Sequence, residues 1–248
     1  MNKTNKIIFF SPHFDDAIFS SAGLILNLLK KEYRVLVVTI FSGVPDYNNL
    51  SLFASKIICP SWVEDREMEN RELLTSNKIE FVNLGFLDNI FRQNDLGQPV
   101  CLSWQDVFAV NTKKINLENN LYNNLKDKII TTINQGPCDA YFPLAIGFHF
   151  DHYLVNKIAR DLAYPKTFYY EDLPYANNSL VADDIRNDYQ VYKTIKINID
   201  DKLSLVSKYK VGLRVGDNSL GVINDIKKYS LSVSSEAGYH ERFWKTKT

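Results

Sequence analysis

The chain has 248 residues, with 29 Lys and Arg against 29 Asp and Glu, so its formal net charge is zero. A general nucleic-acid binder would carry a basic surplus to meet phosphates, and this balance argues against that class. With 45% hydrophobic and 23% charged residues, the composition excludes disordered, collagen-like and fibrous proteins. The length and the absence of linkers or internal repeats predict a single domain over residues 1–248.

Neither membrane insertion nor secretion is expected from the sequence. The longest apolar stretches, such as Ile7–Phe10 and Val35–Val38, are far shorter than the roughly 18 residues of a spanning helix. The short polar start, Met1–Lys6, leads us to expect no secretory signal. The 3 cysteines are widely spaced and lack a paired motif, so we expect a reduced, cytoplasmic protein without disulfides or a cysteine zinc site.

The first forty or so residues predict a strand, a helix and a second strand. Lys6–Ser11 is a nearly unbroken apolar run, which is typical of a strand covered on both faces. Ala17–Lys31 has apolar residues at helical spacing and a cationic end, which suits a helix C-terminus. Arg34–Phe41 is a second strand rich in Val and Ile. The natural arrangement is a parallel strand pair joined by a helical crossover.

The same alternation continues along the chain. We expect further helices at Glu64–Ser76, Leu117–Ile133, Asp151–Leu162, Asp200–Tyr209 and Val222–Ser232. We expect further strands at Glu80–Phe86, Ala140–Ile146, Thr167–Glu171 and Val191–Ile197. Repeated βαβ units predict an α/β, Rossmann-like fold whose mainly parallel sheet is flanked by helices.

Two segments show no clear periodicity. Gln93–Lys114 is interpreted as a long insertion, and loops of that length are often functional. Together with Asn177–Tyr189, this insertion is expected to shape the substrate pocket.

Two polar segments follow predicted strands at their carboxyl ends, where open α/β sheets place ligands. Ser11–Asp16 reads Ser-Pro-His-Phe-Asp-Asp, and residues 147–152 read Gly-Phe-His-Phe-Asp-His. Three of the 4 histidines fall in these segments, and the fourth, His240, is interpreted as a surface or packing residue. Because both segments lie at the same edge of the predicted sheet, they predict a mononuclear metal site.

The spacing within these segments suits a catalytic metal. His149 and His152 are three apart, so both can face one side of a helix that begins near Phe150. Asp15 and Asp16 diverge because they are adjacent, so one can bind a metal while the other faces the bound water. Two histidines and one carboxylate leave a coordination position open, which is typical of catalytic zinc. Zinc lowers the pKa of its water to roughly 7, and a free carboxylate beside that water is a general base.

Together, the two motifs resemble the PIG-L/LmbE family of zinc-dependent de-N-acetylases. The family signature is Pro-His-x-Asp-Asp near the N-terminus and His-x-Asp-His much later, and the order of elements is similar over nearly the whole chain. The resemblance implies an enzyme that hydrolyses an N-acyl amide, expected to be N-acetyl, on an amino sugar or sugar conjugate. It also implies Zn²⁺ or another divalent metal as cofactor and a small molecule as partner.

The resemblance assigns roles to individual residues. It implies the zinc ligands His13, Asp16 and His152. Asp15 becomes the general base that activates water, and His149 stabilises the oxyanion and can protonate the leaving amine. Asp151 is expected to orient a histidine or to cap the helix.

Two positions depart from the family pattern without being ligands. Ala17 stands where many members carry an acidic residue, and Phe14 stands where proline is common. These departures bear on subfamily and substrate rather than on the metal. Ser-Pro-His-x-Asp-Asp-Ala is similar to the branch of the family that acts on specialised metabolites such as glycopeptides.

Further polar residues are candidates for substrate contact. Arg66, Asp88 and Arg92 match positions at which family members carry polar groups, and the arginines could also meet an anion. The weaker candidates are Glu69, Glu171 and Tyr175. The charge-rich stretch around Arg66 is equally typical of a solvated helix face.

Other chemistries find little support, and two alternatives stay open. The sequence has no Gly-x-Gly-x-x-Gly motif, no Walker loop and no Gly-x-Ser-x-Gly elbow, so we expect no nucleotide cofactor. One alternative is a metal-dependent amidase acting on a non-sugar amide in a biosynthetic pathway. The other is a non-catalytic, metal-containing binding protein of the same fold, although such a protein has no need of both Asp15 and His149.

Overall fold

The computed structural model describes residues 6–108, 118–177, 187–213 and 219–247. Its strands are β1 (Lys6–Ser11), β2 (Arg34–Thr39), β3 (Glu80–Asn83), β4 (Cys138–Pro143), β5 (Thr167–Tyr170), β6 (Tyr189–Ile197) and β7 (Tyr239–Thr246). Its helices are α1 (Asp16–Lys30), α2 (Ala54–Ile57), α3 (Trp62–Ser76), α4 (Trp104–Val107), α6 (Asn119–Ile133), α7 (Phe150–Leu162), the 3₁₀ turn η1 (Tyr175–Asn177), α9 (Ile199–Val206), α10 (Lys210–Leu213) and α11 (Ser219–Ser232).

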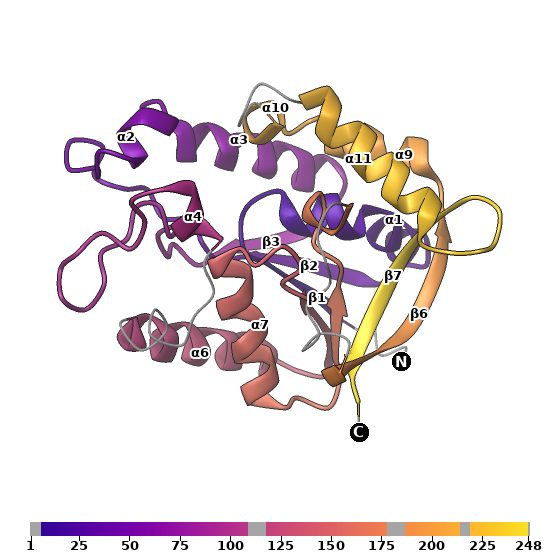
Figure 1. Ribbon diagram of the computed structural model, residues 1–248. Coiled ribbons are helices and arrows are strands. Elements are labelled where there is room, and N and C mark those ends of the chain that lie inside the picture. Colours follow the sequence, from indigo (N-terminus) through magenta and orange to yellow (C-terminus); the bar gives the residue numbers. More distant parts are fainter. Residues whose placement is uncertain (1–5, 109–117, 178–186, 214–218, 248) are drawn as a thin grey trace.

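The strands form one 7-stranded sheet in the order β3-β2-β1-β4-β5-β7-β6. Strands β3, β2, β1, β4 and β5 run parallel, whereas β7 pairs antiparallel with both β5 and β6. Helices α1, α3, α9 and α11 lie on one side of the sheet, and α6 and α7 lie on the other (Figure 1). The predicted α/β fold with a mainly parallel sheet is therefore confirmed.

The order in which strands are added to the sheet reverses between β1 and β4, and this reversal fixes where a ligand can bind. From β1 the chain moves outward to β2 and β3, then returns to place β4 on the other side of β1. The helices that follow β1 and β4 lie on opposite faces (Figure 1). A crevice opens at the carboxyl ends of two strands whose connections diverge in this way. Both polar segments singled out in the sequence follow these two strands.

Stacked aromatic pairs join β1 to β4 beneath this crevice. Phe9 stacks on Tyr141 with ring centroids 4.8 Å apart, and Phe10 stacks on Phe142 at 4.5 Å. The Tyr170 hydroxyl, from β5, donates a hydrogen bond of 2.8 Å to the carbonyl of Phe10. Such pairs add stability beyond their buried area, so the two strand ends that carry the polar loops are held in fixed register.

The C-terminal strand β7 was not predicted, and several strands end earlier than expected. In β7 three polar residues, His240 to Arg242, are followed by two aromatic ones, so neither an apolar run nor an alternation marks the strand. The predicted strand Glu80–Phe86 ends at Asn83, and the predicted strand Ala140–Ile146 lies at Cys138–Pro143. Apolar residues beyond β4, such as Leu144 and Ile146, are buried although they lie outside the strand.

The predicted insertion contains short structure of its own. An isolated bridge joins Gln93 to Pro99, and α4 lies farther along the segment. A small apolar cluster of Ile90, Cys101 and Val107 anchors it apart from the main core. Residues 109–114 of the insertion, residue 117 of the predicted helix and residues 178–186 of the second loop lie outside the described residues. No helix in the described part of the chain is long and apolar enough to cross a membrane.

A buried ion pair ties β7 to the helices on one face. The Glu241 carboxylate accepts hydrogen bonds from the backbone N–H groups of Gly23 at 2.9 Å and Leu24 at 2.8 Å. The Lys202 ammonium, on α9, lies 2.8 Å from the same carboxylate and is fully buried. The two charges balance each other, so removing either one would leave the other buried in a low-dielectric interior without a partner.

Replacing Glu241 with Gln should lower the free energy of unfolding by about 3–5 kcal/mol, because Lys202 would stay buried without a countercharge. Adding Lys202→Met should recover part of that loss. Lys30→Met is the control, since the Lys30–Asp201 pair is exposed and should contribute less than about 1 kcal/mol. Urea unfolding measures all four proteins, and equal losses for Glu241→Gln and Lys30→Met would contradict the prediction.

Candidate active site

The turn after β1 is organised by its own short polar residues. The Ser11 hydroxyl donates to the carbonyl of His13 at 2.5 Å and accepts from the N–H of Ala17 at 3.0 Å. The N–H of His13 donates to Asp16 Oδ2 at 2.7 Å. Asp16 is the first residue of α1, where a helix favours negative charge. The turn therefore places the His13 ring and the Asp16 carboxylate side by side.

The Asp16 carboxylate lies between two histidine rings from different loops. Its Oδ2 is 3.2 Å from His13 Nδ1 and 3.2 Å from His152 Nε2. The His152 Nε2 atom is buried and has no hydrogen-bond partner among the described residues. His149 completes the group, with its ring centroid 4.9 Å from those of both His13 and His152. The three imidazoles offer nitrogens that all lie within 4.8 Å of one another.

Carboxylates stand behind both histidine rings. Asp172 Oδ1 accepts from His152 Nδ1 at 2.6 Å, and Asp172 Oδ2 accepts from the N–H of Ile146 at 3.0 Å. On the other side, Oδ2 of Asp151 and Oδ2 of Asp88 each lie 3.3 Å from His13 Nε2. Each ring is thus held through the nitrogen that points away from Asp16.

Asp172 was not singled out in the sequence. It follows β5 in the same way that the polar segments follow β1 and β4, so its position at a strand end was an available signal. Sequence reasoning selected the neighbouring Glu171 instead. Glu171 is buried against Arg242 and Trp244 of β7, with Oε1 2.8 Å from Arg242 Nε. It holds β7 to β5.

Arg92 lies behind the histidine cluster, in a buried chain of charges. Its Nη2 is 2.8 Å from Asp151 Oδ1, and its Nε donates to Glu118 Oε1 at 2.6 Å. Its Nη1 donates to the carbonyl of Leu87 at 2.9 Å. The guanidinium is therefore engaged by protein groups on several sides, whereas the sequence predicted contact with substrate.

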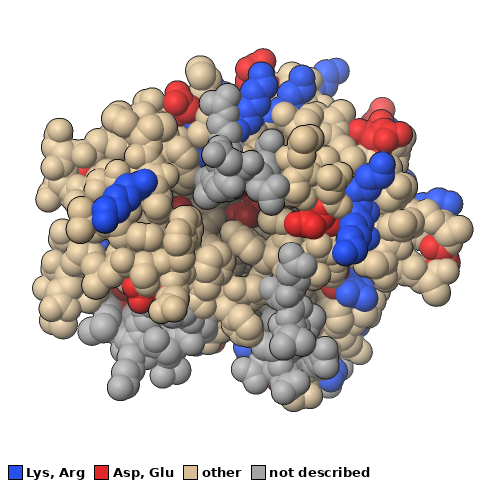
Figure 2. Space-filling view, turned by 45° about the horizontal axis from the view of Figure 1, so that its top comes forward, with Lys and Arg blue, Asp and Glu red and all other residues tan. Residues whose placement is uncertain are grey.

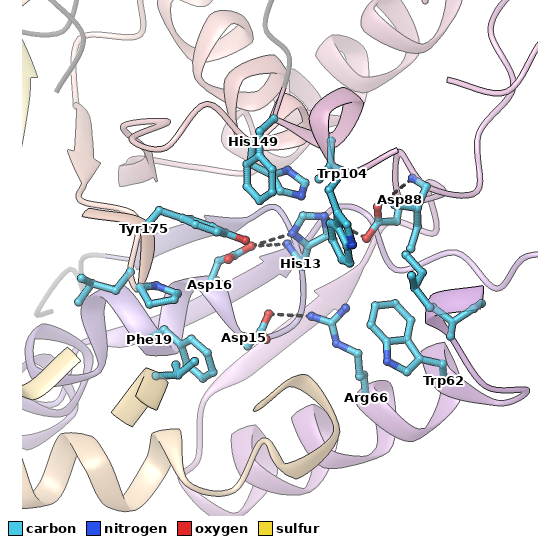
Figure 3. A pocket seen from close by; sticks show the side chains of 18 residues that line it. His13, Asp15, Asp16, Phe19, Trp62, Arg66, Asp88, Trp104, His149 and Tyr175 are labelled. Atoms are coloured by element: carbon cyan, nitrogen blue, oxygen red, sulfur yellow. Dashed lines mark hydrogen bonds and ion pairs between the residues drawn. The ribbon is translucent and has the colours of Figure 1, made fainter. Parts of the chain in front are cut away.

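Asp15 faces away from the rings of His13 and His152 and meets Arg66. Arg66 Nη2 donates to Asp15 Oδ1 at 2.8 Å, and both side chains are buried (Figure 3). The guanidinium also stacks over the ring of Trp62, 4.5 Å from its centroid. One edge of the Asp15 carboxylate is thus fixed by a cation that the protein itself orients.

The charges in the cluster shift its pKa values strongly. Burial lowers the pKa of His152, but the nearby carboxylates of Asp16 and Asp172 outweigh burial and raise it to about 9. Burial raises the pKa of Asp16, yet the two histidines hold it well below its ordinary value. Burial, together with the charges of His13 and His152, holds the pKa of His149 well below its ordinary value.

The remaining candidates occupy different places. Tyr175 lines the pocket, with its ring 5.5 Å from that of His152. Glu69 accepts from the N–H of Val211 at 3.1 Å and so joins α3 to α10. His240 is buried, with Nδ1 3.2 Å from the carbonyl of Gly238, which fits the predicted packing role.

The cluster lies at the floor of a cavity of about 270 Å³. Figure 2 shows the mouth as a hollow with acidic atoms at its floor and mostly uncharged atoms around it. His13, Asp15, Asp16, Arg66, Asp88 and His149 all border this cavity. Of the predicted site residues, Asp151, His152 and Arg92 stand behind this lining, where the described contacts are with protein groups.

Comparison with known proteins finds relatives whose similarity includes both polar segments of the site. The profile of the PIG-L family, described as GlcNAc-PI de-N-acetylase, matches residues 8–163. The chain is 27% identical to 2'-N-acetylparomamine deacetylase from Niallia circulans, over 98% of this chain and 92% of that protein.

Solved structures share the fold. The zinc-inhibited form of teicoplanin deacetylase superposes with a TM-score of 0.83 at 22% identity, covering 98% of this chain and 99% of that one. N,N'-diacetylchitobiose deacetylase from Pyrococcus horikoshii superposes with a TM-score of 0.60 at 13% identity, covering 99% and 84%. The family match spans both polar loops and more than half of the chain, so this protein belongs to the PIG-L family of de-N-acetylases, as the resemblance predicted.

Proposed function

We propose that this protein hydrolyses an N-acetyl amide on an amino sugar or sugar conjugate, with one zinc ion held by His13, Asp16 and His152. The observation that carries the proposal is the position of Asp16 Oδ2, 3.2 Å from one nitrogen of each histidine. Two relatives support the substrate class by name, since both N-acetylparomamine and diacetylchitobiose carry acetyl groups on nitrogen.

The donor atoms fit a divalent metal. Ligand atoms of tetrahedral zinc lie roughly 2.0–2.1 Å from the ion, and therefore about 3.3 Å from one another. The two Asp16 distances of 3.2 Å match that separation. The unpartnered Nε2 of His152 is a buried polar atom that a metal would satisfy. Two imidazoles and a carboxylate also suit other divalent ions, and zinc is proposed because its open three-ligand sites are catalytic.

The buried carboxylates would orient the ligands. Asp172 and Asp151 accept hydrogen bonds from the far nitrogens of His152 and His13, which fixes the tautomer and the plane of each ring. Arg92 and Glu118 hold Asp151 from behind. We therefore propose that Arg92 positions the site rather than touching substrate.

His13, Asp16 and His152 would hold the metal, which would supply a Lewis acid beside the amide carbonyl and the attacking water. Asp15, beside Asp16 but turned away from the rings, would accept a proton from the attacking water, while Arg66 holds the other edge of the carboxylate. His149, whose low pKa keeps it neutral, can donate an N–H to the oxyanion that forms on the amide. As the C–N bond of the amide breaks, the proton taken up by Asp15 would pass to the leaving amine.

The remaining predictions about the whole chain are also proposals. One domain over residues 1–248 is supported by the single sheet, since residues beyond the family match supply β5, β6, β7 and the Asp172 contact. The proposed partner is a small N-acetylated molecule. A cytoplasmic location stays a prediction from the sequence.

Substituting Asp15 with Asn should reduce the turnover number about 10²–10⁴-fold, because the side chain no longer accepts the proton of water. Zinc content should stay at the wild-type level, since Asp15 is not among the proposed ligands. Amine release from an N-acetylated sugar and metal analysis measure the two effects. Exposed Asp46 offers the control Asp46→Asn, and turnover by Asp15→Asn at the control rate would refute the assigned role.

Substituting Asp172 with Asn should weaken zinc binding about 10–100-fold, because His152 loses its anionic partner. Neighbouring Glu171 is the matched control, since it is equally buried but contacts β7. Glu171→Gln should leave the dissociation constant for zinc within threefold or so of wild type. Competition with a chromophoric chelator measures each constant. The role of Asp172 is wrong if both variants bind zinc equally well.

A further inference from the structure

Polar groups gather at one end of the cavity. Asp15, Arg66 and Asp88 border the cavity there, and the Arg66 guanidinium lies over the ring of Trp62. Figure 3 shows Asp15, Arg66 and Trp62 on one side of Asp16. Carboxylates and a guanidinium are groups that can hydrogen-bond sugar hydroxyls. We call Asp15, Trp62, Arg66 and Asp88 the polar end of the cavity.

The opposite end of the cavity is closed by three rings that touch one another. Figure 3 shows His149 and Tyr175 on the other side of Asp16. The ring centroid of Phe108 is 5.6 Å from that of His149 and 5.8 Å from that of Tyr175. The centroids of His149 and Tyr175 are 6.1 Å apart. Rings at these separations are in contact, so they leave no room for a further group between them. We call these three rings the aromatic end.

Packing on two sides holds the aromatic end in place. Val107, the neighbour of Phe108, is buried in the small apolar cluster beneath the insertion. Tyr175 begins η1, and the Asn177 side chain of that turn donates to Asp225 Oδ1 of α11 at 2.8 Å. Both rings beside His149 are therefore carried by anchored segments, and a ligand that needs more space has to displace packed side chains.

The proposed reaction orients the amide between the two ends. Asp15 would pass a proton to the leaving amine, so the amide nitrogen has to lie within reach of the polar end. The acyl chain and the nitrogen are attached on opposite sides of the carbonyl carbon, so the acyl chain then points toward His149 and the aromatic end. That end also suits an alkyl group, since Leu173 and Pro174 border the cavity beside Tyr175.

We propose that Phe108 and Tyr175 determine acyl specificity, because they close the aromatic end so that it accepts an acetyl group and rejects longer acyl chains. This inference rests on the proposed deacylase function and assigns its acyl selectivity to two residues. A longer chain would have to push one of the two rings away from His149. Forcing extra methylenes into packed side chains is unfavourable, and this cost falls on the longer substrates alone.

A series of acyl chains on one sugar tests the limit with the zinc-loaded protein. The compounds are methyl glucosaminides that carry an N-acetyl, N-butanoyl or N-hexanoyl group. From acetyl to butanoyl, kcat/KM for amine release should fall at least about tenfold, because the packed rings resist the added methylenes. Equal values of kcat/KM for the acetyl and hexanoyl compounds would overturn the proposal.

Variants of the cavity lining link the limit to the rings. Phe108→Ala should raise the butanoyl-to-acetyl ratio of kcat/KM by about tenfold, because it opens space beside His149. Tyr175→Ala should raise the same ratio. Retained hydrolysis of the acetyl compound shows that a variant is folded, and the ratio cancels any loss common to both substrates.

Trp104→Ala is the matched control. Trp104 also lines the cavity and is similarly exposed, at 48% against 37% for Phe108, but it lies outside the aromatic end. The ratio should stay at the wild-type value in this variant. If Phe108→Ala and Trp104→Ala change the ratio equally, or if neither changes it, Phe108 does not limit the acyl chain.

A binding measurement separates this inference from the proposed function. Calorimetry with zinc-loaded Asp15→Asn protein, with and without Phe108→Ala, compares the dissociation constants of the acetyl and butanoyl compounds. Weaker butanoyl binding that Phe108→Ala restores, together with no hydrolysis by the wild-type protein, would contradict the proposed function but retain the acyl limit. Hydrolysis by the wild-type protein together with equal binding of both compounds would retain the function and refute the acyl limit.

Discussion

The position of the Asp16 carboxylate between two histidines depends on one topological constraint: the order in which strands are added to the sheet reverses between β1 and β4. Because these neighbouring strands send their connections to opposite faces, the loops that follow them meet across one crevice. One loop brings His13 and Asp16, and the other brings His149 and His152. Asp16 Oδ2 can then lie 3.2 Å from a nitrogen of each of two rings that are distant in sequence. The buried carboxylates, the two arginines that contact them and the cavity are all arranged around that contact.

Buried charge is concentrated at this crevice, and the buried carboxylates fall into two groups according to what they contact. Asp151 and Asp172 meet His13 and His152 at the nitrogens that point away from Asp16, so they fix ring orientation. Asp15 faces Arg66 instead and keeps one edge toward the cavity. Burying so many charges is unfavourable unless each finds a partner. The buried Glu241–Lys202 pair shows the same principle away from the site, where it secures β7.

Local sequence patterns were enough to predict much of the fold and the residues at the centre of the site. The apolar run of β1, the periodicity of α1 and the two His-Asp motifs were sufficient for the parallel sheet, the family and the meeting of the loops. Partners that depend on packing could not be read in that way. Asp172 contacts His152 only because β5 lies beside β4, and Arg92 is buried against Asp151 because Glu118 closes behind it. Strand β7 was missed because its charged residues are paired inside the molecule, which hides the usual alternation.

Anomalous X-ray diffraction at the zinc edge, from crystals grown with one equivalent of zinc, tests the central claim most directly. We predict one strong peak per chain, placed between His13 Nδ1, Asp16 Oδ2 and His152 Nε2, with Asp15 outside bonding distance of it. A peak at any other set of side chains, or no peak despite ordered density for these three residues, would contradict the account.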